Sequence, residues 1–271
     1  MLSEEIKNAF GNATDLIVRP FIIDNREITL VMSEVMASSS YVNDFILKKL
    51  LKLKFTQENI IDELLNNIPT NNGKILTTLK EMSDYICMGF ALILYENKAI
   101  AIEARSTLDR GIGEVSNEST IMGSKDAFNE NFNTNVGLIR RRLRTNELYV
   151  DGLFVGKSSK TKVGILYMHN IATLKNVNDI KEKLKKINVD GIIDSGYLKT
   201  YLDTKTNLLF PTITSTERPD LASQALLEGK IVIITDNSPH ALITPTFFID
   251  YLHTPDDYYG KAINTSFVRI I

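Results

Sequence analysis

The hydrophobic positions near the start of the chain first follow a strand pattern. Two apolar runs, 16–23 and 27–32, are joined at Asp24-Asn25. Asn tolerates the backbone conformation of a tight turn, so the two runs predict a β-hairpin. Pro20 lies inside the first run and predicts an edge strand, because proline cannot donate a ladder hydrogen bond.

Helical spacing then replaces the strand pattern, with apolar residues recurring every three or four positions. The predicted helices cover 42–53, 57–67 with Thr56 as its cap, and 75–88 with Gly89 at its end. A second strand pair, 90–95 and 99–104, is expected to follow around the turn at Glu96-Asn97. These elements complete a first α/β unit.

The second half of the chain repeats this order of elements. Val-Asn-Asp at 42–44 recurs at 177–179, where it again opens a predicted helix. The other corresponding elements are strands at 147–156 and 162–169, a helix at 222–227 ended by Gly229, a strand at 231–234, a turn at 236–239 and a strand at 240–244. A shared order of this kind favours an internal duplication.

A long helix is expected between the two halves, capped by Ser124 and running over 125–144. We therefore predict an α/β fold of two small subdomains, each a mixed sheet with helices, related by an internal duplication and joined by the long helix. The predicted boundaries are 12–110 for the first subdomain, 111–145 for the connecting segment and helix, 146–250 for the second subdomain and 251–271 for a juxtamembrane segment.

Composition and charge restrict the class of function. The 31 basic and 33 acidic residues give a formal charge of −2, which argues against a nucleic-acid partner. The one cysteine, Cys87, lies in an apolar run and is expected to be a buried, inert thiol. No apolar run reaches the roughly 18 to 20 residues that span a bilayer, so we expect this stretch to be soluble.

Four arginines, Arg140, Arg141, Arg142 and Arg144, gather at the end of the connecting helix. Cations there complement the helix dipole, and guanidinium groups can also bind phosphate or carboxylate. Neighbouring helical positions differ by about 100°, so at most two of the four can share a target. Structural or inter-subunit ion pairs are the favoured interpretation. The alternatives are a nucleic-acid surface, which the lack of Trp and of net positive charge argues against, and an enzyme acting on phosphates, for which the arginine run is the only support.

A second charged motif, Glu217, Arg218 and Asp220, surrounds Pro219. Proline suits the first turn of a helix, and acidic groups complement its positive end. Carboxylate pairs can also act as general acids and bases, but no His or Ser stands in a recognisable relation to them. Helix capping and ion pairing are therefore expected here.

The usual signatures of enzymes and cofactor sites are missing from the sequence. His169, His240 and His253 lack metal-ligand spacing. Gly111-Ile112-Gly113 lacks the third glycine of a dinucleotide loop. We expect no enzymatic activity, no cofactor and no metal.

Three stretches together resemble the A subunit of the GerA-type spore germination receptors. They are 118–144, with Leu-Ile-Arg-Arg-Arg at 138–142; 216–239, with Thr-Glu-Arg-Pro-Asp at 216–220 and Asp-Asn-Ser-Pro at 236–239; and 245–259, with Pro-Thr-Phe-Phe at 245–248 and Pro-Asp-Asp-Tyr-Tyr at 255–259. The candidates for interface contacts or structural ion pairs are Asn135, Arg140, Arg141, Arg142, Glu217, Arg218, Asp220, Asp257, Tyr258 and Tyr259.

The resemblance implies the soluble N-terminal domain of a receptor subunit that continues into several transmembrane helices. Such a protein would lie in the inner spore membrane, with this domain on the cytoplasmic side, which is the spore core. It would assemble with B and C subunits and with further copies of itself, and would couple nutrient sensing to germination and ion release. The alternative is a module that binds a small germinant in a cleft between two lobes.

Overall fold

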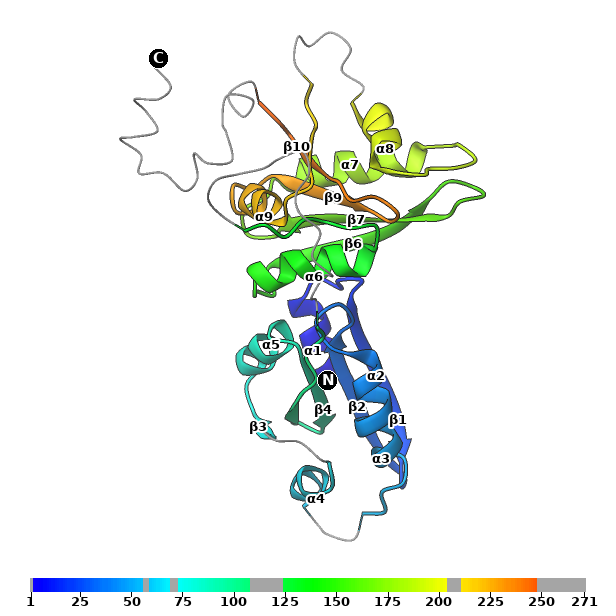
Figure 1. The fold of residues 1–271 in the computed structure, drawn as a ribbon. Helices are drawn as coiled ribbons and strands as arrows, with labels where there is room; N and C mark the ends of the chain where they lie inside the picture. The colour runs from blue at the N-terminus through cyan, green and yellow to red at the C-terminus, as the bar shows by residue number, and fades with distance from the viewer. Residues whose placement is uncertain (1, 56–58, 69–72, 108–123, 204–210, 248–271) are drawn as a thin grey trace, which may run out of the picture. The chain divides into compact units, whose positions relative to one another are not determined.

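The computed structural model describes residues 2–55, 59–68, 73–107, 124–203 and 211–247 (Figure 1). The chain divides into two compact units. The first comprises Met1–Asp109 and Val136–Asp151, and the second comprises Arg110–Asn135 and Gly152–Ile271.

The first unit is built on a five-stranded antiparallel sheet. Its strands are β1 (Leu16–Ile23), β2 (Arg26–Ser33), β3 (Lys74–Leu76), β4 (Phe90–Tyr95) and β5 (Lys98–Glu103), in the order β1-β2-β4-β5-β3. The hairpin turn at Asp24-Asn25 has φ of 49° and 61°, the left-handed geometry that fits the twist of a hairpin. Both the hairpin and the edge position of Pro20 on β1 are confirmed.

Helices bury both faces of this sheet. They are α1 (Leu2–Ala9), α2 (Ser39–Tyr41), the π-helix η1 (Val42–Leu47), α3 (Lys48–Leu50), α4 (Ile60–Asn67) and α5 (Leu79–Cys87). Alternate strand residues such as Leu30, Ile93 and Ile102 form one core with the apolar side of η1, α3 and α4. Their neighbours Val31 and Leu92 are also fully buried, and α5 contacts β2, β4 and β5.

Two predicted helices differ from the structure. The apolar pattern at 75–88 was predicted as a single helix, but Ile75 pairs with Ile100 in β3, and α5 begins only after Thr78. Thr78 accepts a hydrogen bond from the Glu81 amide (3.3 Å) and donates one from its hydroxyl to the Glu81 carboxylate (3.0 Å), and these N-cap contacts fix this start. The helix predicted at 42–53 consists of α2, η1 and α3. The proposed cap Thr56 lies outside the described residues.

A second sheet, which lies in the second unit apart from residues 148–151 of its first strand, has the same strand order. Its strands are β6 (Leu148–Val155), β7 (Thr161–Met168), β8 (Thr214–Thr216), β9 (Ile231–Thr235) and β10 (Ala241–Thr244), in the order β6-β7-β9-β10-β8. Its helices are α7 (Leu174–Lys186), α8 (Ser195–Leu202) and α9 (Pro219–Leu227). Both sheets are antiparallel, so the predicted α/β class is right and the prediction of mixed sheets is wrong. Short hairpins join sequential strands, which requires antiparallel pairing.

The helix predicted over 125–144 is shorter in the structure. It is α6 (Phe132–Arg142), and the side chain of Asn131, not Ser124, accepts the hydrogen bond from the Thr134 amide (2.9 Å) that caps its first turn. Ser124 bonds instead to the Asp126 side chain in irregular chain. In the part of the sequence that the structure describes, no helix combines the length and the hydropathy needed to cross a membrane. The predicted juxtamembrane segment from 251 onward lies outside that part.

Candidate functional site

The arginines of α6 belong to different local environments, as their helical spacing requires. Arg140 is buried and makes a bidentate ion pair with Asp15, with Nε at 2.5 Å and Nη2 at 2.7 Å from the two carboxylate oxygens. Ser33 donates a further hydrogen bond to the same carboxylate (3.2 Å). The two side chains are only 4% and 5% exposed, so each charge depends on the other for its stabilisation.

The next arginines contact the end of α6 itself. Arg142 donates to the Leu138 carbonyl (2.9 Å), and Arg144 donates through Nε to the Arg141 carbonyl (3.2 Å). The carbonyls at the end of a helix carry its negative pole, so these cationic contacts stabilise the helix end. They account for part of the charge at this end of α6.

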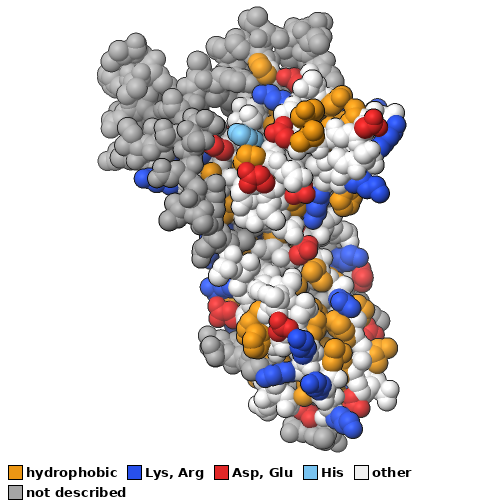
Figure 2. Space-filling model, turned by 45° about the vertical axis from the view of Figure 1, so that its right-hand side comes forward, with side chains coloured by type: hydrophobic (Ala, Val, Ile, Leu, Met, Phe, Trp, Pro, Cys, Tyr) orange, Lys and Arg blue, Asp and Glu red, His pale blue; other side chains and the backbone are white. Residues whose placement is uncertain are grey.

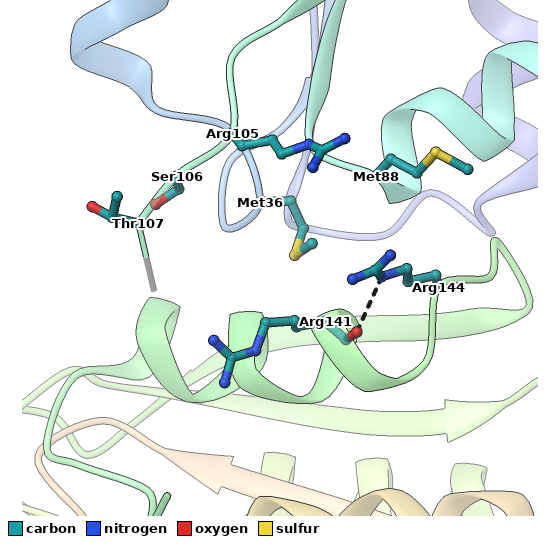
Figure 3. A pocket seen from close by; sticks show the side chains of 7 residues that line it. All are labelled: Met36, Met88, Arg105, Ser106, Thr107, Arg141 and Arg144. Atoms are coloured by element: carbon teal, nitrogen blue, oxygen red, sulfur yellow. Dashed lines mark hydrogen bonds between the residues drawn. The ribbon is translucent and has the colours of Figure 1, made fainter. Parts of the chain in front are cut away.

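Arg141 and Arg144 also line a pocket of about 270 Å³ in the first unit (Figure 3). Arg105 belongs to the same pocket, having been brought there by the chain that follows β5. The remaining lining residues are Met36, Met88, Ser106 and Thr107. The pocket therefore combines three cationic side chains with two apolar ones, and none of its lining residues in the described part of the chain is acidic.

Cys87 lies beside the Arg140 pair at the end of α5. Burial raises the pKa of its thiol to about 12, and the positive charge of Arg140 offsets only part of that effect. The thiolate is the nucleophilic form of cysteine. At neutral pH the buried thiol is therefore protonated and unreactive, which agrees with the interpretation made from the apolar sequence around it.

The Glu-Arg-Pro-Asp motif forms a compact cluster in the second unit. The Arg218 side chain is fully buried and donates two hydrogen bonds to Asp220, from Nε at 3.1 Å and from Nη2 at 2.6 Å. Pro219 is the first residue of α9, where its missing amide costs no helical hydrogen bond. The Glu217 carbonyl accepts from the Phe128 amide (2.8 Å), so this motif also anchors the chain that leads to α6.

Asn135 connects that same leading segment to the β9–β10 turn. Its side chain accepts from the Asn129 amide (2.8 Å) and donates to the carbonyls of Asn129 (2.5 Å) and Ser238 (3.3 Å). Asp236, in the same turn, accepts from the Phe132 amide (3.2 Å). A buried amide that makes three hydrogen bonds to main chain is a structural tie.

The structure thus divides the predicted site residues between the two units. Arg140, Arg141 and Arg142 lie in the first unit, whereas Asn135, Glu217, Arg218 and Asp220 lie in the second. Asp257, Tyr258 and Tyr259 are outside the described residues. Sequence reasoning missed Asp15 and Arg105, because neither stands in a motif and each meets its partners only through the tertiary fold.

Charge is interspersed rather than concentrated on the surface drawn in Figure 2. Basic and acidic side chains alternate over this face, without a continuous basic tract. The charged motif residues are engaged in ion pairs, in helix-end contacts and in the lining of a small pocket. The described residues thus form an α/β domain of two compact units.

The chain belongs to the Bacillus/Clostridium GerA spore germination protein family, whose profile matches residues 4–271. It is 27% identical to spore germination protein KA of Bacillus subtilis over 274 residues, and 34% identical to spore germination protein XA of Bacillus anthracis over 214 residues. These matches cover 98% and 76% of this chain but 50% and 44% of the relatives. The chain therefore spans about half the length of these curated relatives.

A solved structure shares the fold. The crystal structure of the N-terminal domain of the A subunit of the Bacillus megaterium spore germinant receptor GerK3 has a TM-score of 0.65 and 28% identity, covering 90% of this chain and 93% of that one. The resemblance to the N-terminal domain of a germinant receptor A subunit is confirmed, and so is its assignment to a family of receptors rather than enzymes. Another relative, 29% identical over 279 residues, is the membrane protein YfkQ of Bacillus subtilis.

Proposed function

We propose that this domain takes part in assembling a nutrient germinant receptor and in coupling nutrient sensing to germination and ion release. The proposal depends on one observation, which is that both charged motifs form buried ion pairs. Each motif, at 138–142 and at 216–220, places one buried arginine in a bidentate ion pair within its own unit. In this proposal the buried pairs stiffen each unit, so that a change in packing is passed on rather than absorbed.

The proposed partners are the B and C subunits and further copies of the same subunit. The full-length protein would reach the inner spore membrane through helices beyond this chain, with this domain on the spore-core side. Support comes from the relatives, which are about twice the length of this chain and include a membrane protein. The candidates for interface contacts or structural ion pairs are Asn135, Arg140, Arg141, Arg142, Glu217, Arg218, Asp220, Asp257, Tyr258 and Tyr259.

We also propose that the two units arose by duplication, with subdomains at 12–110 and 146–250 joined through the 111–145 segment. The shared strand order of the two sheets supports this. Gly89 and Gly229 add local support. Each lies between a helix and the strand that is third in the order across its sheet, β4 or β9, and each has positive φ, 85° and 80°. Descent of both units from one ancestral unit would account for the shared strand order and for the glycine that ends the corresponding helix in each unit.

The test is germination of spores that carry Arg142→Ala or Asp220→Ala in the full-length receptor. We expect slower germination, followed as loss of optical density after nutrient addition, because Arg142 caps a helix end and Asp220 neutralises a buried guanidinium. Lys48→Ala is the matched control, since this lysine belongs to an exposed pair. Normal germination with normal receptor amounts in both variants would contradict the proposal.

A lower receptor amount must be separated from impaired signalling. Immunoblots of spore membranes measure the amount of the A subunit and of its partners. Loss of all subunits together in the Asp220→Ala spores indicates failed assembly, whereas normal amounts with slow germination indicate failed coupling. Either result supports a role of the domain in the receptor.

A further inference from the structure

On the strand side of the pocket between β5 and the end of α6 in the first unit, the lining residues are held in place by hydrogen bonds and side-chain contacts. Arg105 is held by a β-bridge between its own backbone and that of Ala37, and the Ser106 amide donates to the Met36 carbonyl (2.8 Å). The Arg105 guanidinium lies 5.4 Å from the centre of the Phe90 ring and 3.3 Å from the Glu103 carboxylate. Backbone and side-chain contacts therefore orient this guanidinium.

The helix side supplies the second guanidinium. Arg144 uses Nε to bond the Arg141 carbonyl, which fixes the plane of the group at the helix end. Figure 3 shows Arg105 and Arg144 extending from the strand side and the helix end toward the space beside Met36, while Arg141 extends away along the helix. Two guanidinium groups from distant parts of the sequence thus share one space.

Electrostatics favours an anion in this space. The end of α6 contributes roughly half a negative charge from its dipole. Arg105 and Arg144 bring two positive charges toward this space, and among the described residues that line the pocket none is acidic. Glu103 pairs with Arg105 from outside the lining, on a largely exposed contact that water screens. The positive charge of the pocket therefore exceeds the opposing charges.

We propose that this pocket binds a small oxyanion, a carboxylate or a phosphate, carried by a free small molecule. A planar guanidinium fork matches two oxygens of either group. The volume of about 270 Å³ is below that of pockets for drug-sized ligands, which begin at about 300 Å³, so the ligand is small. Met36 and Met88 offer polarizable apolar walls for a short carbon chain.

The proposal is tested by titrating the purified domain with sodium phosphate and with sodium succinate at constant ionic strength, with sodium chloride as the reference salt. Binding is followed by NMR of the seven methionine methyl groups. We expect saturable shifts at Met36 and Met88 with at least one of the two anions. Shifts spread over all methionines, or no saturable shift with either anion, would overturn the site.

Substitutions separate specific binding from a general charge effect. The double variant Arg105→Gln and Arg144→Gln is expected to weaken the affinity about ten-fold or more, because it removes both charge-assisted forks. Arg19→Gln with Lys98→Gln lowers the net charge equally at exposed positions outside the pocket and should change the affinity less than about two-fold. An equal loss of anion affinity in the two double variants would contradict the proposal.

The two substituted arginines, Arg105 and Arg144, are exposed, so the fold is expected to survive their substitution, as unchanged circular dichroism would show. The charge-retaining variant Arg105→Lys with Arg144→Lys gives a further readout. It should bind with an affinity between those of the wild type and the Gln variant, because ammonium groups keep the charge and lose the bidentate geometry. The readouts measure binding by the domain, so they are independent of germination.

Discussion

The Asp15→Asn substitution provides a direct test of how the first unit is held together. Asp15 is 5% exposed, and its two oxygens accept from the Arg140 fork at 2.5 and 2.7 Å. Asparagine keeps the shape of the side chain and removes its charge. The Arg140 guanidinium then stays buried without a counter-ion, which costs about 3 to 5 kcal/mol when one partner of a buried pair is removed.

A second ion pair of nearly equal length isolates the effect of burial. Asp44 and Lys48 lie 2.6 Å apart in the same unit, but their side chains are 53% and 71% exposed. Exposed pairs contribute about 0 to 1 kcal/mol because water and salt screen them. Asp44→Asn is therefore the matched control, with the same chemical change at a solvated site.

The assay is hydrogen exchange read by mass spectrometry, because the chain has two units and no tryptophan to report on one of them. Asp15→Asn should lower the protection of β1, β2 and β4 by an amount equivalent to the expected free energy, while β7 and β9 of the second unit keep theirs. Asp44→Asn should leave all five strands within about 1 kcal/mol of the wild type.

One outcome would refute the reasoning. If Asp15→Asn and Asp44→Asn cost the same, burial would not determine the strength of these ion pairs, and the Leu-Ile-Arg-Arg-Arg motif would need another explanation. A double variant, Asp15→Asn with Arg140→Met, offers an internal check. It removes both charges and should recover part of the loss, because no unpaired charge remains in the core.

Three further predictions concern single buried positions. Cys87 should resist iodoacetamide in the native domain. The pKa of its thiol is about 12 in the folded state and about 9 in the unfolded state. The wild type should therefore lose stability relative to Cys87→Ala as the pH rises from about 9 to 12, as measured by urea titrations at alkaline pH. Gly89→Ala should destabilise the domain by about 1 to 3 kcal/mol in thermal melts, because φ is +85° and the new Cβ would lie 2.8 Å from the Met36 carbonyl oxygen. In the control Gly191→Ala the nearest atom lies 3.8 Å from the new Cβ, so this variant should lose less stability. Asn135→Ala should cost about 1 to 3 kcal/mol and increase exchange in the β9–β10 turn, where retained protection would show that its hydrogen bonds contribute little.

The sequence by itself determined the features that depend on neighbouring residues. The Asp24-Asn25 turn, the stop at Gly229 and the start of α9 at Pro219 follow from backbone preferences that act over a few positions. The motifs at 138–142 and 216–220 carried the family resemblance for the same reason, since they can be recognised without knowing their partners.

The tertiary structure decided the features that depend on distant partners. Ile75 lies in a strand because β5 offers it an edge, although its local pattern favours a helix. The partner of Arg140 is 125 positions away in the sequence, and Arg105 joins Arg144 in a pocket only through the path of the chain after β5. Helical spacing limited how many of the arginines could bind one target. Only the tertiary fold determined which partner each arginine contacts.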